Sequence, residues 1–326
     1  MTIAANTSLT YGAVAIREDL SDVIYNIAPM DTPFMSGCAK TTADNTFFEW
    51  QTDSITAGAA NRKIEGDDSI GADARVLPTR LGNYTQISQY VNQTSGTDQV
   101  MNYAGHGKNQ AYQLAKNGKR MKRDMESMLT QNVIRAVGDA TTARATAGIP
   151  TWLATSHGAG GSGGSASAGA TGQTLMVNNT STAAASEANI KATIKECYDA
   201  GGSPDMMLVP SNVKQTISAL SQSVSELRTA ANKEAPAAVV AAVDIYVSDF
   251  GTFKIVPDRN LAADGPGSVA ANIFFLDMDY WAIAWLRPFQ TVDLAKTGDS
   301  VKQLLVAEYG LVSKNEASSG ILASVS

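Results

Sequence analysis

The sequence between His106 and Val137 contains one long helical pattern, and this pattern limits the folds open to the chain. Its apolar residues recur every three or four positions, as on one face of an α-helix: Leu114, Met121, Met125, Met128, Leu129, Val133 and Ala136. No proline interrupts it, and Gly138 follows its last apolar residue, where helices commonly end. At a rise of about 1.5 Å per residue, the pattern predicts a helix of roughly 45 Å around which the rest of the chain is organised.

The opposite face of this predicted helix is charged. Five cationic residues precede Asp124 and Glu126: Lys116, Lys119, Arg120, Lys122 and Arg123. This face could be a nucleic-acid patch. Alternatively, it is a solvated or intersubunit face on which Arg120 pairs with Asp124, and Lys122 with Glu126, across one helical turn. The second interpretation is favoured because no aromatic residues interleave with the charges.

The composition narrows the classes of protein to which the chain can belong. Of 326 residues, 44% are hydrophobic and 17% are charged, so a buried core is available. A net charge of −6 argues against a protein whose main task is to grip phosphates. Two cysteines provide no disulfide framework, which fits a reducing compartment. We expect no signal peptide and no membrane span, because no segment reaches about 18 consecutive apolar residues.

The N-terminal 44 residues read as an arm. Residues 1–16 are small and polar, and a short amphipathic helix from Leu20 to Ile27 ends before Pro29. Phe34 follows in a turn, as an aromatic anchor that needs a partner surface on the parent domain or on a neighbouring chain.

Two strand-like runs follow the arm. The first extends from Phe47 to about Ile55 and the second from Leu81 to Val91, around a polar Gly/Asp-rich segment at 57–78. This pattern predicts a long hairpin with a polar tip. An isolated hairpin is only marginally stable in water, so we expect this one to lie on another surface.

The sequence after the long helix predicts a flexible linker and an α/β region. The Gly/Ser/Ala run at 158–172 is typical of a surface loop between subdomains. From Ser186 the pattern predicts a helix ending at Gly201, a strand at Met206–Val209, a helix from Ser211 and a hairpin turning at 249–251. Three apolar strands are then expected to form a sheet against the long helix, before a tucked tail: Ile273–Leu276, Ala282–Leu286 and Val301–Val312.

No catalytic constellation emerges from the sequence. His106 and His157 have no ligands at metal-binding spacing, and solvated loop positions are expected for both. Asp277 and Asp279 follow an apolar strand, where a metal-binding carboxylate pair could sit. A tight turn is the favoured interpretation, because Asp is common in turns and Tyr280 restarts the apolar pattern. We expect no cofactor and no resident metal.

Several stretches, in order along nearly the whole chain, resemble the major capsid proteins of tailed bacteriophages. They are DVIYNIAPMDTPF (22–34), FEWQTDS (48–54), EGDD (65–68), RLGNYTQI (80–87), KRDME (122–126) and AEYGL (307–311). The resemblance implies an α+β chain with the Hong Kong 97-type, or Johnson, fold. Many relatives also carry an N-terminal scaffolding segment that is missing here. Either a separate scaffold protein assists, or such a segment was removed or never existed.

The resemblance also implies a domain layout. It comprises an N-terminal arm (1–44), an extended β-hairpin loop or E-loop (45–100), a peripheral domain with the spine helix and the Gly-rich loop (101–174), an axial domain (175–265), and a return to the peripheral sheet with the C-terminal tail (266–326).

The implied function is mechanical. Copies would assemble into hexamers and pentamers of an icosahedral head, built in the bacterial cytoplasm and retained in the virion, and the hairpin of each would lie over its neighbour. Candidate intersubunit residues are Phe34, Phe48, Trp50, Lys63, Tyr84, Tyr90, Arg120, Arg123 and Glu126. Some relatives crosslink a hairpin-tip lysine, but no assisting acid can be assigned to Lys63.

Further partners would be portal, scaffold and decoration proteins, and packaged double-stranded DNA held by weak non-specific contact. Two alternatives remain open. One is an encapsulin-like nanocompartment shell of the same fold, and the other is a metal-dependent enzyme that uses Asp277 and Asp279.

Overall fold

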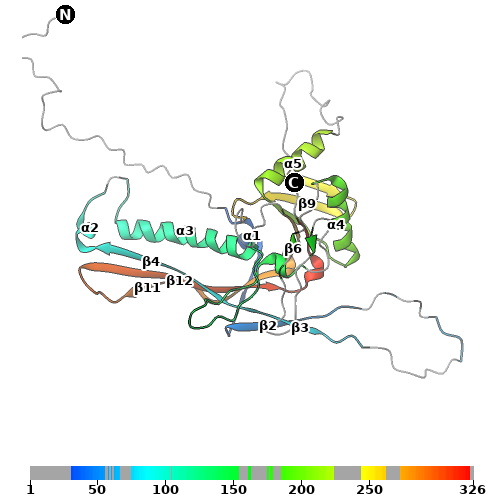
Figure 1. Ribbon diagram of the computed structural model, residues 1–326, viewed down its shortest axis with the longest axis horizontal. Coiled ribbons are helices and arrows are strands. Elements are labelled where there is room, and N and C mark those ends of the chain that lie inside the picture. Colours follow the sequence, from blue (N-terminus) through cyan, green and yellow to red (C-terminus); the bar gives the residue numbers. More distant parts are fainter. Residues whose placement is uncertain are drawn as a thin grey trace, which may run out of the picture.

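The computed structural model of the protein describes residues 31–55, 58, 60, 62–66, 75–103, 105–153, 161–162, 175, 177–178, 185–223, 244–261 and 272–323. The predicted arm over residues 1–30 and His157 lie outside these residues. So does the Gly-rich run, apart from β5 (Gly161–Ser162), which pairs with β6 (Val177–Asn178). An elongated lobe, a rounder α/β lobe and a projecting hairpin make up the described chain (Figure 1).

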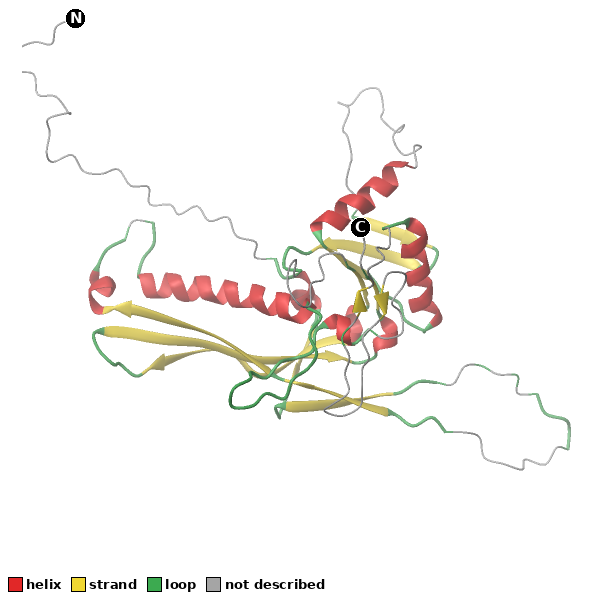
Figure 2. Cartoon of the chain, viewed as in Figure 1, coloured by secondary structure: helices red, strands yellow, loops and turns green. Residues whose placement is uncertain are grey.

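The elongated lobe is one sheet covered by the long helix. Its strand order is β1 (Ala39–Thr42), β11 (Trp281–Leu294), β12 (Ser300–Ser313) and β4 (Gln86–Ser95). Only β1 runs parallel to its neighbour. Helix α3 (Asn109–Thr130) lies along β4 and β12 after the short α2 (Gly96–Val100) (Figure 2). Met121, Met125 and Leu129 are fully buried beneath α3, as the apolar stripe predicts.

Helix α3 ends at Thr130, and the expectation that it reaches Val137 is wrong. Gln131 is extended, and the chain beyond it forms a narrow ribbon in which Ala136 bridges Ala145. The ribbon approaches the helix end so closely that a Cβ at Gly148 would lie 1.8 Å from the Gln131 carbonyl oxygen. Gly138, at φ +73°, belongs to this ribbon and not to a helix terminus.

The α/β lobe contains the second sheet. Its order is β13 (Gly320–Leu322), β10 (Ile273–Leu276), β7 (Met206–Val209), β9 (Gly251–Pro257) and β8 (Ile245–Ser248). Helices α4 (Glu187–Asp199) and α5 (Ser211–Ser223) pack on one face. The Ser186 cap of α4 and the end at Gly201 (φ +91°) are confirmed, as is the β8–β9 hairpin. The sequence places Tyr198 at helical spacing with Ile190, Ile194 and Cys197, but the structure leaves it exposed while the other three are buried.

Strand β10 does not join the sheet beneath α3, and that expectation is wrong. It pairs with β7 and β13, and all four of its residues are buried. A continuous apolar run of this kind suits a strand covered on both faces. Phe275 faces the α4 and α5 side, and Phe274 faces the core shared with the elongated lobe. The C-terminal strand β13 is also buried, which confirms the tucked tail over residues 320–323.

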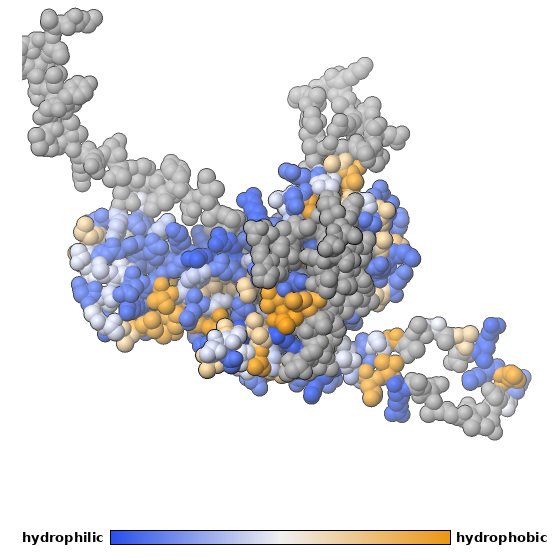
Figure 3. All heavy atoms as spheres, viewed as in Figure 1, coloured by the Kyte–Doolittle hydropathy of each residue, from blue (hydrophilic) through white to orange (hydrophobic). Residues whose placement is uncertain are grey.

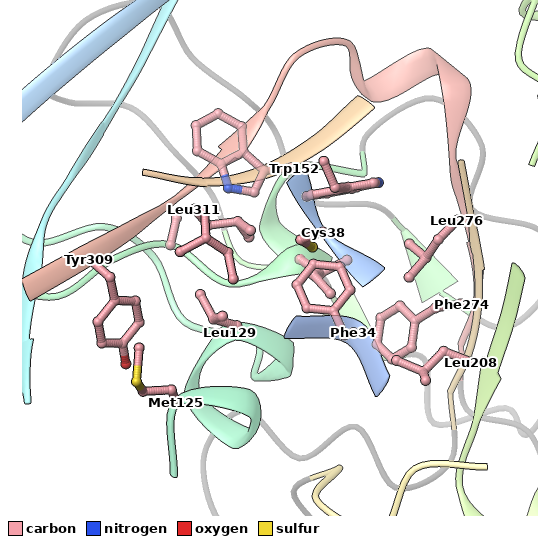
Figure 4. Close-up of a cluster of buried hydrophobic side chains, with 14 of the residues drawn as sticks. Phe34, Cys38, Met125, Leu129, Trp152, Leu208, Phe274, Leu276, Tyr309 and Leu311 are labelled. Atoms are coloured by element: carbon pink, nitrogen blue, oxygen red, sulfur yellow. The ribbon is translucent and has the colours of Figure 1, made fainter. Parts of the chain in front are cut away.

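One hydrophobic core spans both lobes (Figure 4). Helix α1 (Pro33–Gly37) places Phe34 at its centre, 6.0 Å from the ring of Trp281. The labelled side chains around Phe34 come from both sheets and from α3: Cys38, Met125, Leu129, Trp152, Leu208, Phe274, Leu276, Tyr309 and Leu311. Trp152 follows the 3-10 turn η2 (Ile149–Thr151). The lobes therefore share one rigid interior.

The projecting hairpin is β2 (Phe47–Thr52) paired with β3 (Thr79–Tyr84). The predicted hairpin is confirmed, but the predicted single strand from Leu81 to Val91 is wrong. The chain breaks at Thr85, whose hydroxyl donates to the buried Glu308, and then enters the other sheet as β4. The hairpin thus ends at residue 84, and residues 86–95 of the predicted 45–100 segment belong to the elongated lobe.

Candidate assembly surfaces

The root of the hairpin packs on its own chain through aromatic rings. Phe47 lies 4.7 Å from Tyr84, and Trp50 lies 5.9 Å from Phe48 and 5.3 Å from the buried Trp152, as ring-centroid distances. Phe48 covers the backbone of β12 so closely that a Cβ at Gly310 would lie 2.5 Å from its ring. These rings already have partners within the chain. Phe48, Trp50 and Tyr84 therefore make intrachain contacts.

An ion-pair network fixes the point where the hairpin leaves the body. Glu308 is buried, and it accepts from Arg144 at 2.5 Å and from Arg287 at 2.9 Å. The Thr85 hydroxyl donates to the same carboxylate at 2.8 Å. The Arg135 guanidinium donates to the carbonyl of Gly82 on β3. The root is therefore held by charge-assisted hydrogen bonds as well as by aromatic packing.

The described residues of the hairpin tip include large aliphatic side chains that are exposed. Ile55 is 99% exposed, Ile64 is 83% exposed and Leu77 is 77% exposed, and Val76 is exposed beside them. Lys63 is exposed in the same segment, where the sequence places it. Figure 3 shows apolar residues on this projection, away from the body of the molecule. Several large aliphatic side chains in water on a thin projection mark a contact surface that a single chain cannot bury.

Strand β4 turns hydrogen-bonding residues towards its own helix and exposes two aliphatic residues, together with Gln89, Gln93 and Ser95, on its other face. Its even-numbered residues turn polar groups towards α3: the Tyr90 hydroxyl donates to Asp124, Asn117 donates to Asn92 at 2.5 Å, and Thr94 donates to Gln110. Its odd-numbered residues face away, and there Ile87 is 46% exposed and Val91 is 52% exposed. The face of β4 that carries Ile87 and Val91 therefore points out of the chain, and no described residue covers it.

This exposed aliphatic surface continues across the same face of the sheet. Val91 is paired with Leu304 on β12, which is paired with Val292 on β11, so the three share one face. Val292 and Leu294 are exposed, and Leu304 is half-buried. Orange residues line the lower margin of the elongated lobe in Figure 3, below the blue surface of α3. Ile87, Val91, Val292, Leu294 and Leu304 are called the sheet face below.

The exit of the N-terminal arm is clamped by Glu126. Its carboxylate is fully buried and accepts from the backbone N–H groups of Phe34 and Met35 at 2.7 and 2.8 Å. Burial raises the pKa of Glu126 to about 8, against the lowering effect of these two hydrogen bonds, and the nearby Asp258 adds to the rise. The predicted intersubunit roles of Glu126 and Phe34 are therefore wrong, because both side chains are closed to solvent inside their own chain. The predicted Lys122–Glu126 pair fails for the same reason.

The outer face of α3 carries the predicted cations. Arg120 and Arg123 approach Asp124 at 3.9 and 3.6 Å, so the predicted Arg120–Asp124 pair is confirmed. The Arg120 guanidinium also lies 4.7 Å from the centre of the Tyr90 ring. Tyr90, an expected interface residue, therefore uses its hydroxyl and the face of its ring for contacts with α3 of its own chain.

The candidate chemical groups do not form a reactive site. Asp277 caps the 3-10 turn η4 (Met278–Tyr280) by accepting from the Asp279 N–H at 3.2 Å, which confirms the turn. No cluster of three or more His, Cys, Asp or Glu residues able to hold a metal occurs among the described residues. His106 lies in a loop, as predicted, but it is half-buried between the rings of Tyr103 and Tyr112. Within the same described part of the chain, no helix is long and apolar enough to cross a membrane.

The sequence analysis placed the intersubunit contacts on aromatic and charged residues and overlooked the sheet face. The signal in QISQYVNQTS is weak, because Ile87 and Val91 share the odd-numbered face with Gln89, Gln93 and Ser95. The pattern shows two unlike faces, but it does not say which of them the rest of the chain covers.

Comparison with known proteins gives a consistent result. The family model for the SU10 major capsid protein matches residues 3–326. The major capsid protein of Escherichia phage Phieco32 is 27% identical over 327 residues, which cover 91% of this chain and 90% of the relative.

Solved structures share the fold at low sequence identity. The Cyanophage A-1(L) capsid has a TM-score of 0.67 at 13% identity and covers 95% of this chain and 97% of its own. The capsid of the native GTA particle has a TM-score of 0.62 at 13% identity, with 99% and 100% covered. A phage G structure of gp27 major capsid proteins and gp26 decoration proteins has a TM-score of 0.55 at 12% identity, with 100% of both chains covered.

Proposed function

Because the chain belongs to the SU10 major capsid protein family, we propose that its hairpin tip packs on the sheet face of a neighbouring copy. The protein is a tailed-phage major capsid protein, a structural component of the icosahedral shell of the virion. This contact between the hairpin tip and the sheet face, called the interlock below, would hold adjacent copies together within that shell.

The observation that carries this proposal is the row of aliphatic side chains that the sheet face leaves exposed: Ile87 and Val91 on β4, and Val292 and Leu294 on β11. Exposed aliphatic side chains that adjoin across a sheet gain nothing from that arrangement in a monomer. They gain from a second apolar surface, and the tip offers Ile55, Ile64 and Leu77. Each contact is small, but a shell repeats it many times, so modest affinities suffice.

The proposed layout follows from these contacts. Residues 1–44 form the N-terminal arm, clamped at its exit by Glu126. The hairpin over residues 45–84 is the extended loop, and the sheet with α3 is the peripheral domain. The α/β lobe, which contains α4 and α5, is the axial domain that gathers at the centres of hexamers and pentamers.

Further partners are proposed at a coarser level. Portal and scaffold proteins would join the shell during assembly in the bacterial cytoplasm, and the packaged DNA would touch its interior weakly. The phage G structure includes decoration proteins beside its major capsid proteins, which supports a similar partner here. The phage shell is favoured over a nanocompartment by the family match, and the metal-enzyme alternative loses its support with the turn at Asp277.

A cysteine crosslinking experiment tests the proposed interlock. The double variant Leu77→Cys/Val91→Cys places one thiol on the tip and one on the sheet face. We expect mild oxidation of the assembled protein to give covalent multimers, because the two thiols meet across subunits. The native Cys38 and Cys197 are buried and give a low background.

The matched control is Leu77→Cys/Lys119→Cys, which moves the second thiol to the outer face of α3. It should remain monomeric on denaturing gels. Equal crosslinking of both double variants, or none in Leu77→Cys/Val91→Cys shells, contradicts the interlock. Electron microscopy of the expressed protein checks the shell itself, and small oligomers in place of megadalton particles contradict it.

A further inference from the structure

Four cations form a straight stripe on α3. Lys116, Lys119, Arg120 and Arg123 stand at positions i, i+3, i+4 and i+7, which bring them onto one side of a helix. Met121 and Met125 lie on the opposite side and are fully buried. Lys116 and Lys119 are exposed on the side of the stripe, whereas the Arg120 guanidinium reaches back over the Tyr90 ring on β4. Helix α3 lies along the upper left of the molecular body, where blue residues gather in Figure 3. Lys122 is exposed on the flank of the stripe.

The charge of the stripe and its flank is poorly neutralised. Of the two acids on α3, Glu126 is buried and engaged with the backbone of α1, so Asp124 alone faces the five cations. Asp124 is itself shared between Arg120, Arg123 and the Tyr90 hydroxyl. Lys116, Lys119 and Lys122 enter no ion pair with any residue that the structure describes. A chain with a net charge of −6 thus concentrates positive charge on one helix face.

The two arginines are held by contacts within the chain, whereas the lysine side chains of α3 extend into solvent. Arg120 rests on the Tyr90 ring and beside Asp124, and Arg123 lies beside the same carboxylate. These contacts hold the Arg120 guanidinium against β4 and hold both guanidinium groups beside Asp124. Lysine is a flexible, strongly hydrated point charge, which suits contact with a partner that has no fixed register. The stripe is built for a polyanion rather than for one carboxylate at one position.

The position of the α3 stripe in the fold indicates which polyanion it contacts. The sheet face lies on the opposite side of the lobe, and our proposed function assigns it to the neighbouring subunit. A shell one subunit thick has two broad surfaces, and helix α3 lies on the one away from the sheet face (Figure 1). We propose that the α3 stripe lines the interior of the shell and contacts the phosphate backbone of the packaged double-stranded DNA. This inference rests on the proposed function.

The expected contact is weak for each copy and independent of DNA sequence. About four cations contact at most about four phosphates, which predicts a slope of about −3 to −4 when the logarithm of the binding constant is plotted against that of the salt concentration. Affinity for one chain is therefore low at physiological salt. Repetition over the shell supplies attraction without fixing the DNA at any one position.

The test uses the unassembled full-length chain and a fluorescein-labelled 30-base-pair duplex, followed by anisotropy at about 50–200 mM salt. The triple variant Lys116→Gln/Lys119→Gln/Lys122→Gln removes both lysines of the stripe and the lysine on its flank. We expect affinity at low salt to fall by at least about tenfold and the slope to shrink by about 2. The matched control, Lys40→Gln/Lys195→Gln/Lys254→Gln, removes the same charge from exposed lysines elsewhere and should bind within about twofold of the wild type.

Equal losses in the two triple variants, or an unchanged slope in the stripe variant, overturn the proposal. Particle formation separates it from the shell function. The stripe variant should still assemble into normal particles. If it fails to assemble while it binds DNA like the wild type, the stripe is an intersubunit surface and the DNA assignment is wrong. If the wild-type chain forms no particles, the proposed function fails on its own.

Discussion

The root and the tip of the hairpin belong to the same pair of strands but differ in what surrounds them. At the root, Phe48 and Trp50 rest on the body of their own chain, and Glu308 binds two arginines beside them. At the tip, Ile64 and Leu77 are more than three-quarters exposed. The root has the contacts of a folded core, and the tip has apolar side chains with nothing to pack on.

The difference indicates that the two ends of the hairpin have different roles. The root fixes the direction in which β2 and β3 leave the body of the molecule. The tip then supplies the apolar surface for a partner. Substitutions at the root should change folding, whereas substitutions at the tip should change assembly.

The largest expected effect at the root is the loss of its buried carboxylate. Glu308→Ala leaves Arg144 and Arg287, which are 24% and 44% exposed, without the buried carboxylate that they share. We expect the free energy of unfolding of the unassembled chain to fall by about 3–4 kcal/mol, measured by urea denaturation. A loss below about 0.5 kcal/mol, as is typical of exposed sites, would show that the network does not hold the root.

The next effect concerns aromatic packing. Trp50→Ala removes the ring that stacks on Trp152 and should cost about 3 kcal/mol of monomer stability. Leu77→Ala is the matched change at the tip and should cost less than about 0.5 kcal/mol. Thermal melts of both unassembled variants test the comparison directly. Equal destabilisation by both would erase the distinction between root and tip.

A pH titration compares the root with the arm exit. Glu126 has a pKa of about 8 in the folded chain, above its ordinary value of 4.5. Between these values the folded chain holds a proton that the unfolded chain has released, so stability should fall as pH rises through this window, by up to about 5 kcal/mol. Glu126→Gln should flatten that part of the curve in chemical denaturation series. An equally steep decline in the variant would assign the pH dependence to other groups.

The smallest effect concerns the close approach between hairpin and sheet. In Gly310→Ala the new methyl group would meet the Phe48 ring at 2.5 Å and the Tyr84 carbonyl oxygen at 3.1 Å. Because the backbone oxygen cannot move freely, we expect a loss of about 1–2 kcal/mol. Phe48→Leu in the same chain should restore part of it by making room. No recovery in the double variant would mean that the strain lies elsewhere.

The sequence predicted most elements because their apolar spacing is local. The stripe of α3, the cap at Ser186, the β8–β9 hairpin and the Asp277 turn all follow from neighbouring residues. It could not predict the burial of Glu126, since the partners of this carboxylate are backbone N–H groups 91 and 92 residues away. It also could not say which face of β4 is covered, because alternation defines two faces without assigning either. Phe34, expected to seek a partner, found it in its own core.

The most direct test of the account is assembly of tip variants whose folding is unchanged. Ile64→Asp and Leu77→Asp place a charge where the proposed contact is apolar, and Gln215→Asp adds the same residue on the exposed face of α5 as a control. Sedimentation velocity and electron microscopy report particles, and thermal melts report the folding of the unassembled chains.

The account predicts that both tip variants melt like the wild type, within about 0.5 kcal/mol, and form no megadalton particles, whereas the control assembles normally. Normal particles from both tip variants, or a clear loss of monomer stability in either, would contradict the claim that the tip is an intersubunit contact.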